Sequence, residues 1–405
     1  MAVGVAPAQN FFSVDGIRLA AVAANIRYKE RPDLVLIEIA AGSVVSGVFT
    51  QNAFCAAPVI VARNHLAQRS SQFFLINTGN ANAGTGETGE TDALRCCNAV
   101  ADLAGNESWQ VLPFSTGVIG EKLPVERIIN SLPNAFQKLT DSNWGLAAQG
   151  ILTTDTRPKL SSAQVSIDDQ VVTITGLAKG AGMIKPNMAT MLSYVFTDAC
   201  IDQKSLDGFL REAVNLSFNR LTVDGDTSTN DCCMLTATGL SGVMISDIED
   251  DACQKFKEAL LGVFLELATN LIKDAEGATK FVTVEVNQGK DEQECLQVAY
   301  CIAESPLVKT ALFASDPNWG RILAAVGRAG LEGLDIDSVK IYLGETQIVA
   351  AGARAPGYRE ELGQLEMNQE EIAIRIDLAR GSHSERVWTS DLSHDYVRIN
   401  AEYRT

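Results

Sequence analysis

A glycine-rich segment that leads into an apolar run is the feature that most constrains this sequence. The segment reads Lys179-Gly-Ala-Gly-Met-Ile-Lys-Pro-Asn-Met-Ala-Thr-Met-Leu192, and the apolar run extends from Met191 to Phe196. Glycine, proline and asparagine in succession are typical of a turn, and an apolar run with valine, tyrosine and phenylalanine is typical of a buried strand. We therefore expect a turn, then a junction of small residues at Ala189-Thr190, then a strand of the core.

The residues alone leave two interpretations of Thr190 open. A threonine at this point is most simply a β-branched residue in a buried strand. Alternatively, the chain is cut before Thr190, and a new α-amino group then lies within reach of the Thr190 hydroxyl. An amine of this kind, with a pKa of roughly 7.7–8.0, can activate a hydroxyl that is a poor nucleophile by itself.

The composition is that of a globular protein and argues against several classes of partner. The 405 residues can bury a large core, and 46% of them are hydrophobic while 20% are charged. A net charge of −17 disfavours nucleic acid and anionic membranes, because like charges repel. No apolar run reaches the roughly 18 residues of a membrane-spanning helix, and the N-terminus lacks the pattern of a signal peptide.

Cysteine and histidine usage argues against a metal site. The nine cysteines include no C-x-x-C pair, and the three histidines are scattered. A zinc site therefore has few ligands to draw on. An odd number of cysteines without an export signal fits a reduced, cytoplasmic chain. We expect no metal and a cytoplasmic location.

Two motifs partly match known binding motifs, one for a dinucleotide and one for calcium. Gly84-Thr-Gly-Glu-Thr-Gly89 matches the dinucleotide fingerprint and follows an expected strand at 73–76. We disfavour a dinucleotide because the glycines begin several residues after the strand and because Glu87 and Glu90 would repel a pyrophosphate. The acidic segment 222–231 lacks the glycine spacing and the glutamate of a calcium loop. We expect no cofactor.

Periodicity predicts a mixed α/β protein. Helical spacing is clearest at 248–273, where a glycine after Glu276 ends the pattern. Other expected helices lie at 91–103, 124–131, 144–151, 205–218 and 322–329. Expected strands lie at 34–39 and 43–50, in a hairpin at 165–175, and at 281–286, 339–343 and 372–378. The polar segment 153–159 predicts a solvated loop, and from about 286 onward strands and turns are expected to alternate.

The central segment resembles the autocleavage segment of the ornithine acetyltransferase (ArgJ) family of arginine biosynthesis. Further matches cover essentially the whole chain, notably Asn77-Thr-Gly-Asn-Ala-Asn-Ala83, Asp316-Pro-Asn-Trp-Gly-Arg-Ile322 and the ending Asp395 to Thr405. The resemblance implies that the chain cuts itself between Ala189 and Thr190. It also implies an α/β fold, a layered αββα-type sandwich of the N-terminal-nucleophile kind with a smaller C-terminal α/β domain.

Roles for individual residues follow from the same resemblance. Thr190 would be the nucleophile, and Thr116 and Gly117 would form the oxyanion hole, where a hydroxyl and a backbone N–H can stabilise the tetrahedral oxyanion. Lys179 suits an α-carboxylate, and Glu276 suits an ammonium group. Substrate contacts are implied for Thr153, Lys179, Thr190, Glu276, Asn400 and Thr405.

The implied reaction transfers an acetyl group from N2-acetyl-L-ornithine to L-glutamate through an acetyl-Thr190 intermediate, with ping-pong kinetics. From the same resemblance we expect acetyl-CoA to be used as a second donor to glutamate, although no residue pattern decides it. The rival within enzymes is an N-terminal-nucleophile amidase or aminopeptidase, in which water replaces glutamate. Two more distant rivals are a dinucleotide-dependent oxidoreductase and a non-catalytic binding protein in which Thr190 stays uncleaved.

Processing sets the expected organisation of the chain. Cleavage would give two pieces, 1–189 and 190–405, which usually assemble in this family as an α2β2 heterotetramer. Within the second piece, we expect 190–285 to complete the catalytic domain and 286–405 to form the C-terminal α/β domain.

Overall fold

The computed structural model of the protein describes residues 2–4, 11–27, 29–185, 191–248 and 250–402. Its strands are β1 (Ile17–Val22), β2 (Leu34–Ile39), β3 (Val44–Phe49), β4 (Phe73–Asn80), β5 (Val111–Val118), β6 (Lys159–Ile167), β7 (Gln170–Lys179), β8 (Leu192–Thr197), β9 (Cys200–Ile201), β10 (Leu221–Thr222), β11 (Cys232–Ala237), β12 (Met244–Ile245), β13 (Phe281–Gly289), β14 (Lys340–Leu343), β15 (Thr346–Ala350), β16 (Ala353–Arg354), β17 (Glu371–Asp377) and β18 (His383–Ser390). Its α-helices are α1 (Ala57–Leu66), α2 (Gly86–Ala104), α3 (Val125–Gln137), α4 (Trp144–Gly150), α5 (Gln203–Leu216), α6 (Asp251–Lys273), α7 (Glu292–Ala303), α8 (Pro306–Phe313), α9 (Trp319–Gly327), α10 (Glu360–Met367) and α11 (His394–Ala401).

Two sheets pack face to face in the larger part of the molecule. One has the strand order β1-β2-β4-β5 and the other the order β3-β11-β8-β7-β6. Alternating side chains of both sheets fill the space between them. Phe114 of β5 and Tyr194 of β8 come from opposite sheets, and their ring centroids are 5.2 Å apart. The expected apolar run after the glycine-rich turn is therefore a central core strand, β8.

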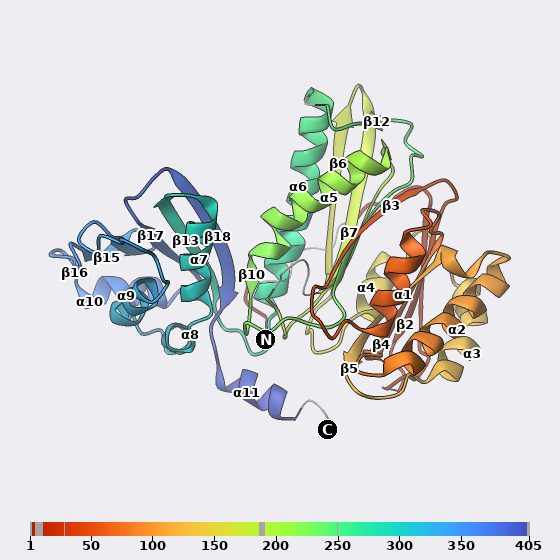
Figure 1. The fold of residues 1–405 in the computed structure, drawn as a ribbon, viewed down its shortest axis with the longest axis horizontal. Coiled ribbons are helices and arrows are strands. Elements are labelled where there is room, and N and C mark those ends of the chain that lie inside the picture. The colour runs from red at the N-terminus through yellow and green to blue at the C-terminus, as the bar shows by residue number, and fades with distance from the viewer. Residues whose placement is uncertain (1, 5–10, 28, 186–190, 249, 403–405) are drawn as a thin grey trace.

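Helices cover the outer faces of both sheets (Figure 1). The first sheet packs against α2 and α3 through a core that includes Val100 and Leu132. The second sheet packs against α5 and α6 through a core that includes Phe209 and Phe264. The order helix, sheet, sheet, helix is the αββα sandwich that the sequence resemblance implies, so the predicted fold class is confirmed.

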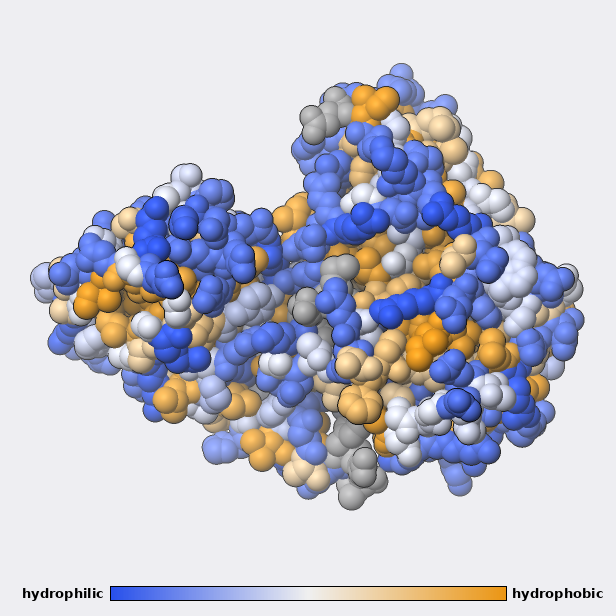
Figure 2. Space-filling view, viewed as in Figure 1, coloured by the Kyte–Doolittle hydropathy of each residue, from blue (hydrophilic) through white to orange (hydrophobic). Residues whose placement is uncertain are grey.

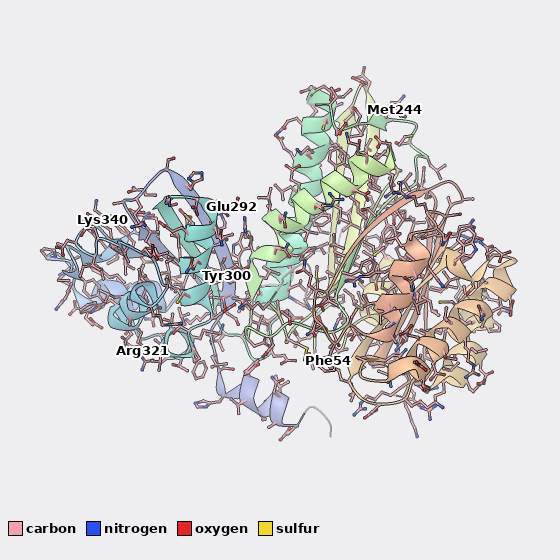
Figure 3. The ribbon with its side chains drawn as sticks, viewed as in Figure 1. Phe54, Met244, Glu292, Tyr300, Arg321 and Lys340 are labelled. Carbon is pink, nitrogen blue, oxygen red and sulfur yellow. The ribbon has the colours of Figure 1, made fainter. Side chains whose placement is uncertain are left out.

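A second unit is built on the sheet β10-β18-β13-β17-β14-β15-β16, with α7, α8 and α9 contributing to its core. Contacts between this unit and the segment after α5 include a hydrogen bond from Tyr300 Oη to the Asn219 carbonyl at 2.6 Å and an ion pair between Arg220 and Glu292 at 2.8 Å. Tyr300 and Glu292 are labelled in Figure 3. In Figure 2 the two units form a largely hydrophilic surface with a notch between them. The domain boundary at 285/286 stays a prediction, and β13 runs across it.

Several expectations differ from the structure in detail. β2 and β3 follow one another across a short turn but lie in different sheets, so this turn joins the two layers. The expected helix at 322–329 is present as α9, but the region after 286 also contains helices that the sequence did not predict. Some of these, such as α8 and α11 with eight residues each, are too short for a clear periodic signal. Gly86 and Gly89 of the fingerprint lie in the first turn of α2. No helix among the described residues is long and apolar enough to span a membrane.

Close packing of α6 on the second sheet generates a stability prediction. A Cβ atom at Gly176 of β7 would lie 2.9 Å from Leu267 Cδ1 of α6 and 2.9 Å from Val195 Cγ2. Gly176→Val should therefore destabilise the protein by about 1–3 kcal/mol through overpacking. The control Gly262→Ala, at an exposed α6 position with no atom within 4 Å of the new Cβ, should stabilise it slightly. Thermal unfolding of both variants measures this, and an unchanged midpoint for Gly176→Val would contradict the packing described.

Candidate active site

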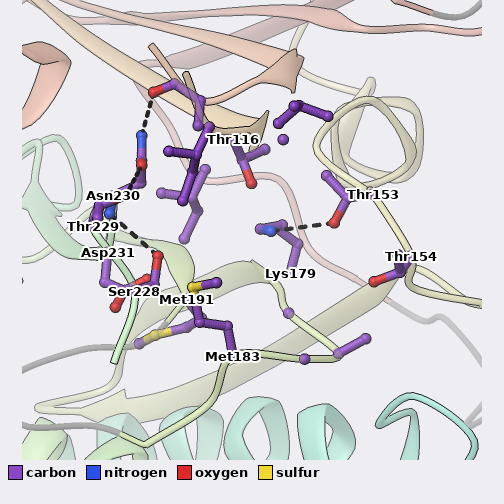
Figure 4. A pocket seen from close by; sticks show the side chains of 18 of the residues that line it. Thr116, Thr153, Thr154, Lys179, Met183, Met191, Ser228, Thr229, Asn230 and Asp231 are labelled. Carbon is purple, nitrogen blue, oxygen red and sulfur yellow. Dashed lines mark hydrogen bonds between the residues drawn. The ribbon is translucent and has the colours of Figure 1, made fainter. Parts of the chain in front are cut away.

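Segments far apart in the sequence meet around one pocket of about 270 Å³ (Figure 4). It lies where β5 and β7 end, beside the start of β8 and the loop before β11. Its described lining is Ala81, Thr116, Gly117, Val118, Ile119, Thr153, Thr154, Lys179, Gly180, Ala181, Gly182, Met183, Met191, Leu192, Ser228, Thr229, Asn230, Asp231, Glu276 and Asn400. A concave site with converging polar groups is the usual form of a small-molecule site.

Thr116 and Gly117 form one wall of the pocket at the end of β5. Gly117 has φ +133°, and a Cβ there would lie 2.3 Å from the Gly79 carbonyl carbon, so only glycine fits. The Thr116 hydroxyl donates no hydrogen bond to any described residue, which leaves it available to a ligand. Asn230 fixes the neighbouring backbone by donating to the carbonyls of Ala81 at 2.6 Å and Ser115 at 2.9 Å.

Lys179 at the end of β7 supplies a positive charge to the pocket. Its Nζ donates to Thr153 Oγ1 at 3.4 Å (Figure 4). Burial lowers the pKa of Lys179, and the carboxylates of Asp155, Asp231 and Glu276 partly offset this effect. A positively charged lysine in this position can bind a carboxylate.

Asp231 is a buried carboxyl group with unused hydrogen-bonding capacity. It is 3% exposed, and its Oδ2 has no hydrogen-bond partner among the described residues. Burial raises the pKa of Asp231 well above its usual value. The next residue, Cys232, donates its N–H to the Met191 carbonyl at 2.9 Å. Asp231 is thus a buried carboxyl group beside Met191, the residue that follows Thr190 in the sequence.

Glu276 and Asn400 close the pocket from the second half of the chain. Asn400 of α11 donates to Glu276 Oε2 at 2.7 Å, and the Glu276 N–H donates to the Ala181 carbonyl at 2.9 Å. A Cβ at Gly182 would lie 2.5 Å from Glu276 Oε2. The glycine-rich turn therefore lets this carboxylate approach the backbone closely.

A buried ionic triad, formed by Asp155, Lys159 and Asp274, supports both sides of the pocket. Lys159 Nζ lies 2.5 Å from Asp155 Oδ1 and 2.6 Å from Asp274 Oδ2, and all three side chains are at most 1% exposed. Asp155 also accepts the N–H groups of Gly180 at 2.8 Å and Thr153 at 3.1 Å. Burial alone would raise the pKa of Asp155, but Lys159 and Lys179 hold it below its usual range.

The structure brings six of the expected residues to one pocket: Thr116, Gly117, Thr153, Lys179, Glu276 and Asn400. Their individual roles stay predictions. Ala189, Thr190 and Thr405 lie outside the described residues. No cluster of three or more metal-ligating side chains occurs within the described ranges.

Sequence reasoning missed the ionic triad, and it placed Asp231 only within a segment expected to support the active site, without a role of its own. The solvated loop predicted for 153–159 is wrong for Asp155 and Lys159, because their side chains are buried. Their opposite charges four residues apart were the available signal. For Asp231 the sequence offers only its place at the start of an apolar run, which does not distinguish it from an ordinary loop carboxylate.

The triad predicts a large effect of removing its cation. Lys159→Met leaves two buried carboxylates without a counterion, so it should destabilise the protein by about 3–5 kcal/mol. The control Lys204→Met removes an exposed ion pair with Asp247, in which Lys204 is 85% exposed, and should change stability little. Thermal unfolding of both variants is the measurement. Equal midpoints for the two variants would show that the triad does not support the fold.

Known proteins resemble this chain over its full length. The sequence profile of the ArgJ family matches residues 18–405. The arginine biosynthesis bifunctional proteins ArgJ of Pseudomonas fluorescens and Psychrobacter arcticus are each 54% identical to it, over 100% of both chains. The crystal structure of the protein of that name from Bacillus halodurans is 39% identical, with a TM-score of 0.50, and the match covers 52% of this chain and 99% of that chain. The chain therefore belongs to the ArgJ family.

Proposed function

We propose that the pocket transfers an acetyl group between amino acids, as an ornithine acetyltransferase of arginine biosynthesis. The donor is N2-acetyl-L-ornithine and the acceptor is L-glutamate. The observation that carries this proposal is the pocket itself, which unites six residues implicated by family resemblance from both sides of the Ala189–Thr190 bond.

In the first half-reaction, Thr190 Oγ attacks the acetyl carbonyl carbon while the Thr190 α-amino group accepts the hydroxyl proton. Thr116 and the Gly117 N–H stabilise the oxyanion. The C–N bond then breaks, the proton passes to the departing amine, and ornithine leaves an acetyl ester on Thr190. In the second half-reaction, the glutamate amine attacks this ester, Thr190 is regenerated and N-acetylglutamate is released.

Both substrates are amino acids, which explains how one pocket can serve both. We assign their shared α-carboxylate to Lys179 and Thr153, and the ammonium group of ornithine to Glu276 and Asn400. Charge-assisted hydrogen bonds of this kind are stronger than neutral ones and fix the orientation of the reacting carbonyl.

Cleavage before Thr190 is part of the proposal. The match to the Bacillus halodurans crystal structure covers nearly all of that chain but only about half of this one, as is expected for one of two pieces. We propose that the pieces 1–189 and 190–405 remain together in the cytoplasm and assemble as an α2β2 heterotetramer. The relatives are called bifunctional, and for a second reaction we propose acetyl-CoA as donor to glutamate.

The proposed function predicts that the chain is cut into two pieces. The proposed nucleophile is an N-terminal threonine, so the chain must be cut before Thr190. This cut divides the 43.4 kDa chain into pieces of roughly 20 and 23 kDa. Intact mass measured under denaturing conditions should show both pieces for the wild type and a single chain for Thr190→Ala. A single full-length wild-type chain with transfer activity would contradict the proposed general base. Release of acetate from N2-acetylornithine without glutamate-dependent transfer would instead identify an amidase.

The assignment of Lys179 to the α-carboxylate predicts how the KM for glutamate depends on pH. Lys179 must be protonated to bind a carboxylate, and burial lowers its pKa from the usual 10.5. The KM for glutamate should therefore rise with increasing pH already below the range in which an ordinary lysine titrates. In Lys179→Arg, whose guanidinium stays charged, this alkaline rise should be absent. KM measured from about pH 7 to about pH 10 tests the assignment, and the same rise in both proteins would contradict it.

A further inference from the structure

One carboxylate fastens the backbone that precedes the proposed cleavage bond. Asp224 Oδ2 accepts the Met183 N–H at 2.6 Å, and Asp224 Oδ1 accepts the Ile184 N–H at 2.9 Å. The Ile184 carbonyl in turn accepts the Val223 N–H at 2.7 Å. The turn at 183–184 is thus held by three hydrogen bonds to two consecutive residues.

The conformation at this turn is one that a methionine rarely adopts. Met183 has φ +53°, in the left-handed region that favours glycine. Two successive N–H groups that converge on one anion form a concave backbone site for negative charge. The Asp224 carboxylate occupies that site, so its hydrogen bonds offset the strain of the left-handed residue.

The same carboxylate is connected to the helix that closes the pocket. Tyr396 Oη of α11 donates to Asp224 Oδ2 at 3.3 Å, and α11 also carries Asn400, which contacts Glu276. A further ion pair joins Lys185 to Glu304 at 3.0 Å. Met183, Ile184 and Lys185 belong to the proposed first piece. Their partners in these contacts belong to the proposed second piece. These contacts therefore join the two proposed pieces.

We propose that Asp224 is a positioning residue for self-cleavage. It fixes the turn at Met183 and Ile184, and thereby sets the position from which the chain runs on towards the bond between Ala189 and Thr190. It acts through the backbone and contributes no group to the bond that breaks. After cleavage, the same hydrogen bonds retain the end of the first piece against the second. This inference rests on the self-cleavage proposed above.

The test compares cleavage rates of three chains. Asp224→Asn replaces one accepting oxygen by an NH2 group that faces a backbone N–H, so cleavage should slow by at least about tenfold. Tyr396→Phe is the matched control, because it removes a contact to the same carboxylate but keeps both backbone hydrogen bonds. It should cleave within about twofold of the wild type. The fraction of full-length chain after pulse labelling gives the rates, and circular dichroism confirms folding.

A rescue variant separates positioning of the turn from general destabilisation. Glycine adopts a positive φ without steric cost, so Met183→Gly makes the turn less dependent on the carboxylate. Asp224→Asn combined with Met183→Gly should therefore cleave faster than Asp224→Asn alone. General damage to the fold would not be repaired by a glycine at this position.

The outcomes separate this inference from the proposed function. Wild-type rates in a folded Asp224→Asn, or no rescue by Met183→Gly, would overturn the role of Asp224 while leaving self-cleavage intact. An uncleaved wild type would instead remove the proposed processing. If Asp224→Asn does not fold, Asp224→Glu, which displaces the carboxylate by one methylene, takes its place. Wild-type cleavage in that variant would equally overturn the inference.

Discussion

The buried triad of Asp155, Lys159 and Asp274 is the interaction on which the pocket most depends. Three charged side chains are removed from water, and each is stabilised only by the others and by neighbouring polar groups. Asp155 fixes the backbone at Thr153 and next to Lys179, while Asp274 lies two residues before Glu276. One lysine therefore sets the spacing between two walls of the pocket. Buried ion pairs are costly to form, but an apolar core in their place would not orient polar binding groups.

A second constraint is the close approach of backbone segments at glycine. Gly117 permits β5 to pass against Gly79, and Gly182 permits Glu276 to approach the turn after β7. Both contacts lie at the edge of the pocket, where any side chain would push a functional group away. The proposed oxyanion hole and the proposed ammonium contact thus rely on positions at which only a hydrogen atom fits.

Much of the fold could be predicted from the sequence, because long periodic segments such as α6 and the β6–β7 hairpin carry strong local signals. The short helices α8 and α11 could not, since eight residues give too little periodicity. The site was accessible only through family resemblance. Thr116 and Gly117 look like an ordinary turn, and Lys179 and Glu276 lie nearly 100 residues apart, so no local pattern brings them together. Asp231 and the triad could not be recognised in the sequence, because what distinguishes them is the burial of their charged side chains, and burial is known only from the three-dimensional structure.

The most direct measurement is the mass of each polypeptide after incubation with N2-acetylornithine in the absence of glutamate. A covalent acetyl intermediate on Thr190 predicts one acetyl group on the piece that begins at Thr190, none on the piece that ends at Ala189, and loss of the acetyl group when glutamate is added. Transfer to glutamate without any acetylated polypeptide, or acetylation of the first piece alone, would contradict the central claim that Thr190 carries the acetyl group.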